Sequence, residues 1–287
     1  MKIKNSFVQE SFVWNGHSDD DFRDAAIRLS DVADYLRELN EHICSQDDLY
    51  FIEILQGVSI SDLFLSNETD PLNDEKQLVI EILKTVYHEE ENEKFDDEIG
   101  LQFYTVENPV EGPARQSAGF AQYLFQRRGI LAGCITCQEF SSFMKTCFPD
   151  IIFAEDIEKG IRGIPDFRYP CVREAIVHDL GILNDEGLSI YEKHYPQFEE
   201  MFKELSTKVL DCSPDKPENR KYLTFSFSYS LDSGETQIKA VFCSPHTKLI
   251  RRDSDLRIYF DWQDADVGAR QKVLVGHIGG HPYPKKR

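Results

Sequence analysis

The sequence predicts an α+β protein in which an acidic α/β and helical body is followed by a C-terminal four-stranded antiparallel meander. Three observations lead to this fold class. Apolar residues recur at helical spacing in several segments before residue 210, apolar and polar residues alternate after residue 221, and a segment with two prolines among polar residues, 212–221, separates the two patterns. We therefore expect an acidic α/β region over 1–112, a helical region over 113–215 and an antiparallel β region with a basic C-terminal end over 216–287.

The first region is expected to alternate strands and helices. From Ser18, apolar residues such as Phe22 and Leu36 recur at three- or four-residue steps or their sum, and three aspartates in the first turn suit the positive end of the helix dipole. Strands are expected on both sides of this helix, and a second helix over 75–88. The segment 89–98 holds seven acidic residues in ten positions, which predicts a solvated loop.

Amphipathic helices are expected through the second region. Apolar stripes at helical spacing run through four segments, 117–128, 137–147, 171–183 and 196–210. In the last segment Pro196 suits the first turn of a helix. The residues expected to form the buried face of that helix are Phe198, Met201, Phe202, Leu205 and Val209.

The third region changes to a period of two, which is typical of strands with one buried face. Leu223, Phe225, Phe227 and Tyr229 alternate with threonine and serine, and a turn at 232–234 returns the chain as a hairpin. The segments "LRIYFDW" and "KVLVGHI" predict a second pair of strands. Together the two pairs predict the four-stranded meander.

Cysteine usage and hydropathy favour an intracellular protein. The seven cysteines are an odd number scattered along the chain, and the first residues form no apolar leader, so neither secretion nor a disulfide framework is expected. No uncharged apolar run approaches the roughly 18 residues that a membrane span needs. We expect a cytoplasmic protein with no membrane partner.

Basic residues concentrate near the end of this acidic chain. The formal net charge is −19, yet nine lysines and arginines stand against five aspartates from Ser244 to Arg287. A local basic patch can bind phosphate within a Debye length of about 8 Å even on an acidic protein. The residues expected to contact RNA or single-stranded nucleic acid are His246, Lys248, Arg251, Arg252, Lys285, Lys286 and Arg287. The alternative is a solvated tail.

No metal site and no cofactor are expected. The chain contains no GxxxxGK[ST], GxGxxG or HExxH motif, so the P-loop, dinucleotide-binding and zincin classes lack their minimal residues. Cys134 and Cys137 form a lone CxxC, whereas a structural zinc site needs four ligands. We predict free cysteines at these two positions.

Groups suited to RNA cleavage gather on the last two expected strands. Alternation places Arg257 and Tyr259 on one face, which is not expected to be a core face. His277 ends the neighbouring strand, and the sequence leaves open whether the register puts it beside Tyr259 or behind it; His281 and Tyr283 follow in the turn. Metal-free RNA cleavage needs a base for the 2′-hydroxyl proton, a cation for the phosphate and an acid for the leaving oxygen. These five residues are the candidate catalytic residues.

Arg173 and His178 form an alternative catalytic pair. Their Arg-x4-His spacing resembles that of HEPN-type ribonucleases over these six residues. A cation and a base that titrates near neutral pH, placed on one helix, suit cleavage without a metal.

The stretch "LRIYFDW…KVLVGHIGGHPY", about 30 residues ending at Tyr283, resembles the last two strands of toxins of the RelE/ParE superfamily. In that family an Arg-[Ile/Leu]-x-[Tyr/Phe] strand is followed by an apolar strand, a Gly-His-[Lys/Arg]-type turn and a final tyrosine. Arg257, His277 and Tyr283 fall on these positions, and Ile278 stands where a basic residue is usual. The resemblance implies a ribonuclease, ribosome-dependent or free, or a gyrase inhibitor.

We therefore expect a metal-independent ribonuclease or toxin-like effector acting on RNA, in prokaryotic stress or antiviral defence; the defence setting is implied by the resemblance alone. The alternative is a non-catalytic interaction subunit of a multiprotein complex whose C-terminal sheet docks a partner. A protein partner or a homo-oligomer is expected in either case.

Overall fold

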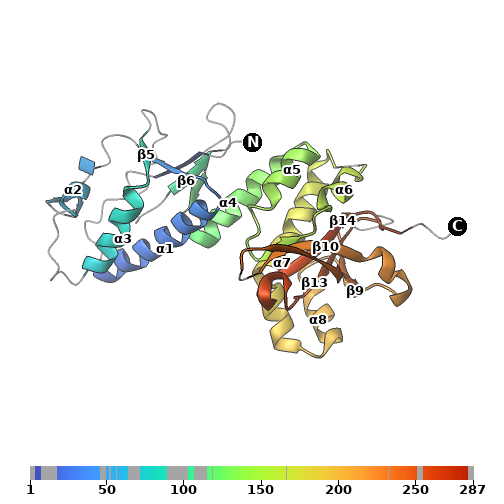
Figure 1. Cartoon of the computed structure of the whole chain (residues 1–287). Coiled ribbons are helices and arrows are strands. Elements are labelled where there is room, and N and C mark those ends of the chain that lie inside the picture. Colours follow the sequence, from blue (N-terminus) through green and yellow to red (C-terminus); the bar gives the residue numbers. More distant parts are fainter. Residues whose placement is uncertain are drawn as a thin grey trace. The chain divides into compact units, whose positions relative to one another are not determined.

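The structure is a computed structural model in which two compact units are found, Met1–Arg127 (unit 1) and Arg128–Arg287 (unit 2). It describes residues 4–7, 18–45, 50–51, 53–55, 57–63, 72–88, 103–106, 115–117, 119–165, 167–231, 233–250 and 255–283 (Figure 1). Helices and strands are both present in each unit, so the predicted α+β class is confirmed. Most of the helical region expected over 113–215 lies in the same unit as the β region expected from 216 onward.

Unit 1 contains a five-stranded mixed sheet of order β5-β2-β1-β6-β7. Its elements are β1 (Lys4–Phe7), α1 (Asp19–Glu38), β2 (Ile43–Ser45), β3 (Glu53–Leu55), β4 (Val58–Ser59), α2 (Ile60–Leu63), α3 (Asn73–Leu83), β5 (Tyr87–His88), β6 (Phe103–Val106) and β7 (Arg115–Ser117). The strand expected before α1 and the acidic segment 89–98 lie outside the described residues. The helix expected over 75–88 ends earlier, at Leu83, and a short strand follows it.

The first predicted helix is confirmed as α1. Ser18 caps it, because its hydroxyl accepts from the Asp21 amide at 3.2 Å while the Asp21 carboxylate accepts from the Ser18 amide at 2.8 Å. Phe22, Leu29 and Leu36 are buried on one side of the helix. That side and α3 form the core of unit 1.

Unit 2 begins within α4, and three of the four helices expected from apolar stripes lie wholly within it. The helices that lie wholly or partly in it are α4 (Phe120–Gly133), α5 (Cys137–Met144), α6 (Ile157–Arg162), α7 (Pro170–His194) and α8 (Phe198–Leu205), with the 3₁₀ helices η3 (Pro217–Tyr222) and η4 (Val267–Arg270). The predicted core face of α8 holds for Met201 and Leu205, which are fully buried, whereas Phe198 is 48% exposed. In the described part of the chain, no helix is long and apolar enough to cross a membrane.

A five-stranded sheet of order β8-β14-β13-β12-β9 forms the centre of unit 2. Its strands are β8 (Ile151–Phe153), β9 (Cys212–Pro214), β12 (Pro245–Lys248), β13 (Arg257–Asp261) and β14 (Val273–Gly279). The predicted antiparallel pairing of β13 with β14 is confirmed, and β14 also pairs in parallel with β8, more than 100 residues earlier in the chain. This parallel pair joins the helical part of the unit to its β part.

The predicted hairpin also forms, but it lies over the central sheet rather than within it. β10 (Thr224–Ser230) and β11 (Thr236–Phe242) pair along their full length as a separate two-stranded sheet. The hairpin lies beside β13 and β14 (Figure 1). It approaches β14 so closely that a Cβ on Gly276 would lie 2.2 Å from a ring carbon of Phe225. The four expected strands therefore do not make one continuous meander.

Both faces of the central sheet are covered, one by α7 and the other by the hairpin. On one face α7 approaches β14, where a Cβ on Gly187 would lie 2.8 Å from a methyl group of Val273. On the other face Phe227 and Val241 of the hairpin belong to the same apolar cluster as Tyr259. Tyr259 is fully buried, so the expectation that its face is not a core face is wrong. The hairpin supplies the cover that the alternation pattern alone did not reveal.

Candidate functional site

Four polar side chains meet at one end of the sheet face that the β10–β11 hairpin covers. The Tyr259 hydroxyl lies 3.2 Å from Oδ2 of Asp215 and 2.7 Å from Nδ1 of His281. The Tyr283 hydroxyl donates to the same Oδ2 at 2.8 Å. We call Asp215, Tyr259, His281 and Tyr283 the Asp215 cluster.

The strand register explains why these residues converge. Tyr259 on β13 lies directly opposite His246 on β12 and opposite His277 on β14, so the register left open by the sequence puts His277 beside Tyr259. Asp215 comes directly after β9, the neighbour of β12. Its backbone amide donates to the Ser244 carbonyl at 3.0 Å, which holds it at the start of β12.

Asp215 is held as an anion by its donors. Burial raises the pKa of its carboxyl, but hydrogen bonds from Asn219, Tyr283, the Lys216 amide and Tyr259 outweigh burial and hold the pKa below its usual value. The Asn219 amide lies 2.7 Å and the Lys216 amide 2.6 Å from Oδ1. A carboxylate with this many donors stays ionised at neutral pH.

The tyrosines of the cluster keep their protons. Burial raises the pKa of Tyr259, with Tyr283 and Asp215 adding to the effect, and burial followed by Asp215 raises the pKa of Tyr283. Because Tyr259 donates its single proton to the Asp215 carboxylate, its oxygen accepts from the Nδ1–H of His281. In this arrangement Nε2 is the basic nitrogen of the neutral His281 ring.

His281 is the partly exposed end of the series of hydrogen bonds that begins at Asp215. Its side chain is 20% exposed, and its ring stacks against that of Tyr283 with centroids 4.8 Å apart. Nε2 lies 4.0 Å from Oδ1 of Asp255. The arrangement fixes the ring from one side and turns its second nitrogen away from the Tyr259 hydroxyl, which suits proton transfer.

Arg257 supplies a cation beside the cluster. It stands two residues before Tyr259 on β13, opposite Lys248 of β12, and it is half-buried. Its position on the strand puts it on the same face as Tyr259, and its charge lowers the pKa of His246 and of Tyr283. Of the five residues predicted to be catalytic, Arg257, Tyr259, His281 and Tyr283 are therefore brought together.

His277, the fifth candidate, occupies a structural position. Its ring stacks on Phe225 at 9° between the planes, and its Nε2 lies 2.8 Å from the Gly280 carbonyl, to which it donates. A Cβ on Gly160 would lie 2.6 Å from Cε1 of the ring, so α6 packs directly against it. Burial lowers the pKa of His277, and these contacts oppose the expectation that substrate reaches the ring.

The predicted nucleic-acid contacts are divided by burial. His246 is 7% exposed, and burial followed by the charge of Arg257 lowers its pKa to about 4, so it is a neutral interior residue rather than a phosphate ligand. Lys248 is partly exposed and forms an ion pair with Asp211. The other five residues, Arg251, Arg252, Lys285, Lys286 and Arg287, lie outside the described part of the chain.

The side chains of the alternative catalytic pair on α7, Arg173 and His178, do not lie together. Arg173 is 4% exposed and donates to the carbonyls of Ala132, Phe167 and Arg168 at 2.7 to 3.1 Å. The His178 side chain is 57% exposed, and at about 100° per residue it lies about 140° around the helix from Arg173. Arg173 thus joins helices and loops, and the structure does not bring it together with His178.

The cysteines offer no cluster of ligands. Cys134 is buried with its thiol 3.7 Å from the Ile130 carbonyl, and the Cys137 thiol lies 3.8 Å from the Ile161 carbonyl. Among the residues that the structure describes, no group of three or more His, Cys, Asp and Glu side chains is arranged to hold a metal ion.

Asp215 and Asn219 are the residues of the site that sequence reasoning missed. Both lie in the segment 212–221, which its prolines and polar residues mark as a linker. The partners of Asp215 on β13 and after β14 are 44 and 68 residues away, so no local pattern connects them. The one local signal is an aspartate that directly follows a short strand and precedes a proline-initiated turn.

Comparison of the chain with known protein families, with curated proteins and with solved structures found no match.

Proposed function

We propose that unit 2 cleaves RNA without a metal ion and that His281 is the general base. The observation that carries the proposal is the chain of hydrogen bonds from Asp215 through Tyr259 to Nδ1 of His281. This chain fixes both the orientation and the tautomer of a histidine at the protein surface, as a carboxylate does in other hydrolytic sites. Arg257 provides the cation that a phosphate group requires.

The proposed cleavage reaction uses His281, Arg257 and a proton from solvent. Nε2 of His281 takes the proton of a ribose 2′-hydroxyl, and the 2′ oxygen attacks the adjacent phosphorus. The bond from phosphorus to the 5′ oxygen breaks, and the leaving oxygen takes a proton from solvent. Arg257 stabilises the charge that builds on the phosphate oxygens. The products are a 2′,3′-cyclic phosphate and a 5′-hydroxyl end.

Within this scheme the cluster residues have different roles. His281 and Arg257 touch the substrate and are the catalytic residues. Tyr259 is buried and Asp215 is partly buried, and through the Tyr259 hydroxyl the two residues position the His281 ring. Tyr283 stacks on that ring and donates to Asp215, so it restricts the ring from a second direction.

The test is cleavage of single-stranded RNA by the full-length chain in the presence of EDTA. His281→Ala is expected to lower the cleavage rate by about 10² to 10⁴, since general-base catalysis contributes that much. Its melting temperature should fall only modestly, because the variant removes a partly exposed ring and one hydrogen bond to Tyr259. The matched control is His178→Ala, which removes an exposed histidine outside the cluster and should leave cleavage unchanged.

Two further outcomes decide the proposal. A substrate with 2′-deoxyribose throughout should be resistant, because it lacks the attacking hydroxyl. Cleavage that persists in His281→Ala, or that leaves a 3′-hydroxyl end, contradicts the mechanism. An intact chain that cleaves no RNA would instead favour the non-catalytic subunit whose C-terminal sheet docks a partner.

A further inference from the structure

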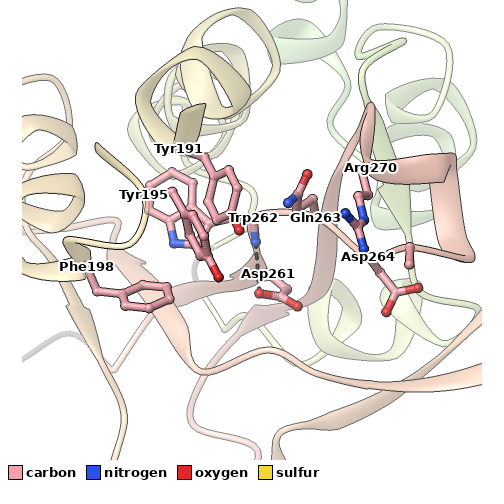
Figure 2. A pocket seen from close by; sticks show the side chains of 9 residues that line it. Tyr191, Tyr195, Phe198, Asp261, Trp262, Gln263, Asp264 and Arg270 are labelled. Carbon is pink, nitrogen blue, oxygen red and sulfur yellow. Dashed lines mark hydrogen bonds between the residues drawn. The ribbon is translucent and has the colours of Figure 1, made fainter. Parts of the chain in front are cut away.

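A pocket opens at the other end of β13, and none of its lining residues belongs to the Asp215 cluster. Its volume is about 490 Å³. The lining comes from the end of α7, the start of α8, the last residue of β13 and the loop that follows (Figure 2). The side chains that line it are Tyr191, Tyr195, Phe198, Asp261, Trp262, Gln263, Asp264, Ala265 and Arg270.

Two of its aromatic rings form a right-angled corner. Tyr195 and Phe198 are 56% and 48% exposed, and their rings meet at 84° with centroids 6.1 Å apart. Behind them Tyr191 lies 5.1 Å from Tyr195 at 33°, and Trp262 is almost completely buried (Figure 2). A separation of 5.1 Å leaves no slot for a flat base between Tyr191 and Tyr195, whereas a right-angled corner fits a compact group that contacts two ring faces.

Asp261 brings a carboxyl group to this aromatic lining. Its Oδ1 accepts from the Trp262 backbone amide at 3.0 Å, and no basic side chain among the described residues lies within ion-pair distance of it. Burial, followed by the charge of Asp264, raises the pKa of Asp261 to about 6. A partly buried carboxylate without a positive partner is costly, so a cation at this position would be bound favourably.

The other charged residues of the pocket are already matched or stand apart. Both oxygens of Asp264 accept from Lys239 at 2.8 Å, and Lys239 also binds Asp266. Figure 2 shows Arg270 and Asp264 on one side of Asp261, and Tyr195 and Phe198 on the other. Asp261 therefore lies between the aromatic side chains and the other charged residues of the pocket.

We propose that this pocket binds an organic cation, an alkylammonium group that contacts the faces of Tyr195 and Phe198 and pairs with the carboxylate of Asp261. Aromatic faces attract such cations through the ring quadrupole, and quaternary ammonium groups are well suited because they are compact and weakly hydrated. The group belongs to a free small molecule or to a modified lysine of a polypeptide, and both sources present the same chemistry to the pocket.

The test is isothermal titration of the full-length chain at pH 7.5 with choline and with its neutral isostere, 3,3-dimethylbutanol. Choline should bind at least 10-fold more tightly than the isostere. Asp261→Asn, which keeps the acceptor for the Trp262 amide, should weaken choline binding at least 10-fold. Tyr195→Leu removes an exposed ring face and should weaken it similarly, whereas Tyr195→Phe should not. Asp266→Asn removes a charge from the same loop without lining the pocket and is the matched control.

A trimethyllysine peptide and its unmodified counterpart distinguish the two sources. Tighter binding of the modified peptide than of choline indicates a polypeptide ligand, and the reverse order indicates a free amine. Binding of the isostere as tightly as choline, binding unaffected by both Asp261→Asn and Tyr195→Leu, or binding of guanosine but of neither cation would overturn the proposal. Failure of both choline and the modified peptide to bind would overturn it as well.

Discussion

The two ends of β13 place an aspartate in opposite electrostatic situations. Asp215, at the Arg257 end, accepts hydrogen bonds from four donors, and its pKa is lowered although burial acts to raise it. Asp261, the last residue of the strand, accepts one hydrogen bond from the Trp262 amide, and its pKa is raised to about 6. Desolvation acts in the same direction on both carboxyls, so the number of donors decides which one is a stable anion. The first carboxylate is matched by four donors within the fold, and the second has one backbone donor.

The largest effect is expected from removing the matched carboxylate. Asp215→Ala should lower the free energy of unfolding by about 3 kcal/mol, because it leaves the Tyr283 hydroxyl and the Asn219 amide without their acceptor and deprives Tyr259 of one of two partners. Urea denaturation of the full-length chain, followed by near-UV circular dichroism, measures the change in unit 2. Asp215→Asn retains one acceptor oxygen and should cost less than half as much; equal losses in the two variants would mean that space rather than hydrogen bonding is what Asp215 provides.

A smaller change in the free energy of unfolding, of opposite sign, is expected from substituting Asp261. Its folded pKa is raised, so the native state binds more protons than the unfolded state between about pH 4 and 6, and the stability associated with this group is lost as the pH rises through that window. Asp261→Asn removes the loss and should raise the free energy of unfolding by about 2 kcal/mol at pH 8. Below pH 4 the two proteins should be equally stable.

The stability difference between the wild type and Asp261→Asn at pH 4 serves as the control for the difference at pH 8. The charged groups that line the pocket together with Asp261 are Asp264 and Arg270. Burial raises the pKa of Asp264, but hydrogen bonds from Lys239 and two backbone amides hold it below its usual value. A stability difference that is the same at pH 4 and pH 8 would show that Asp261 acts through packing and not through its charge.

The smallest effect is expected from one hydroxyl group. Tyr283→Phe removes a single donor to Asp215 and should lower the free energy of unfolding by about 1 kcal/mol. It should also raise the pKa of Asp215, which NMR titration of the carboxyl carbon can follow. Tyr229→Phe is the matched control, since the Tyr229 hydroxyl donates to Gln237 in an exposed pair on the hairpin and should be nearly neutral. An unchanged Asp215 pKa in Tyr283→Phe would mean that the number of donors does not set the charge of this carboxyl.

Local patterns predicted the elements whose causes are local. The Ser18 cap and the apolar spacing after it predicted α1, and the alternation in the hairpin predicted which side chains of β10 are buried. The pairing of β13 with β14 could also be predicted, because only a short connection separates the two strands.

Long-range packing decided what the sequence could not. The burial of Tyr259 depends on a hairpin that folds over the sheet, and strand alternation is the same whether or not such a cover exists. Phe198 has the spacing of a core residue, but it lies at the first position of α8, where the face of the helix opens into the pocket. The segment that supplies Asp215 has the composition of a linker, and its role depends on strands that are distant in sequence.

The parallel pairing of β8 with β14 has a consequence for how the protein is made. β14 is the last strand of unit 2 in chain order, yet it stands between β8 and all the other strands of the central sheet. A nascent chain that has emerged as far as residue 272 can form its helices and the β10–β11 hairpin, but not the complete sheet on which they pack. During synthesis of unit 2 the apolar surfaces of the helices and the hairpin therefore stay exposed until β14 leaves the ribosome. His281, which follows β14, can contact Tyr259 only after that. Assembly of the Asp215 cluster is in this way tied to translation of the final strand.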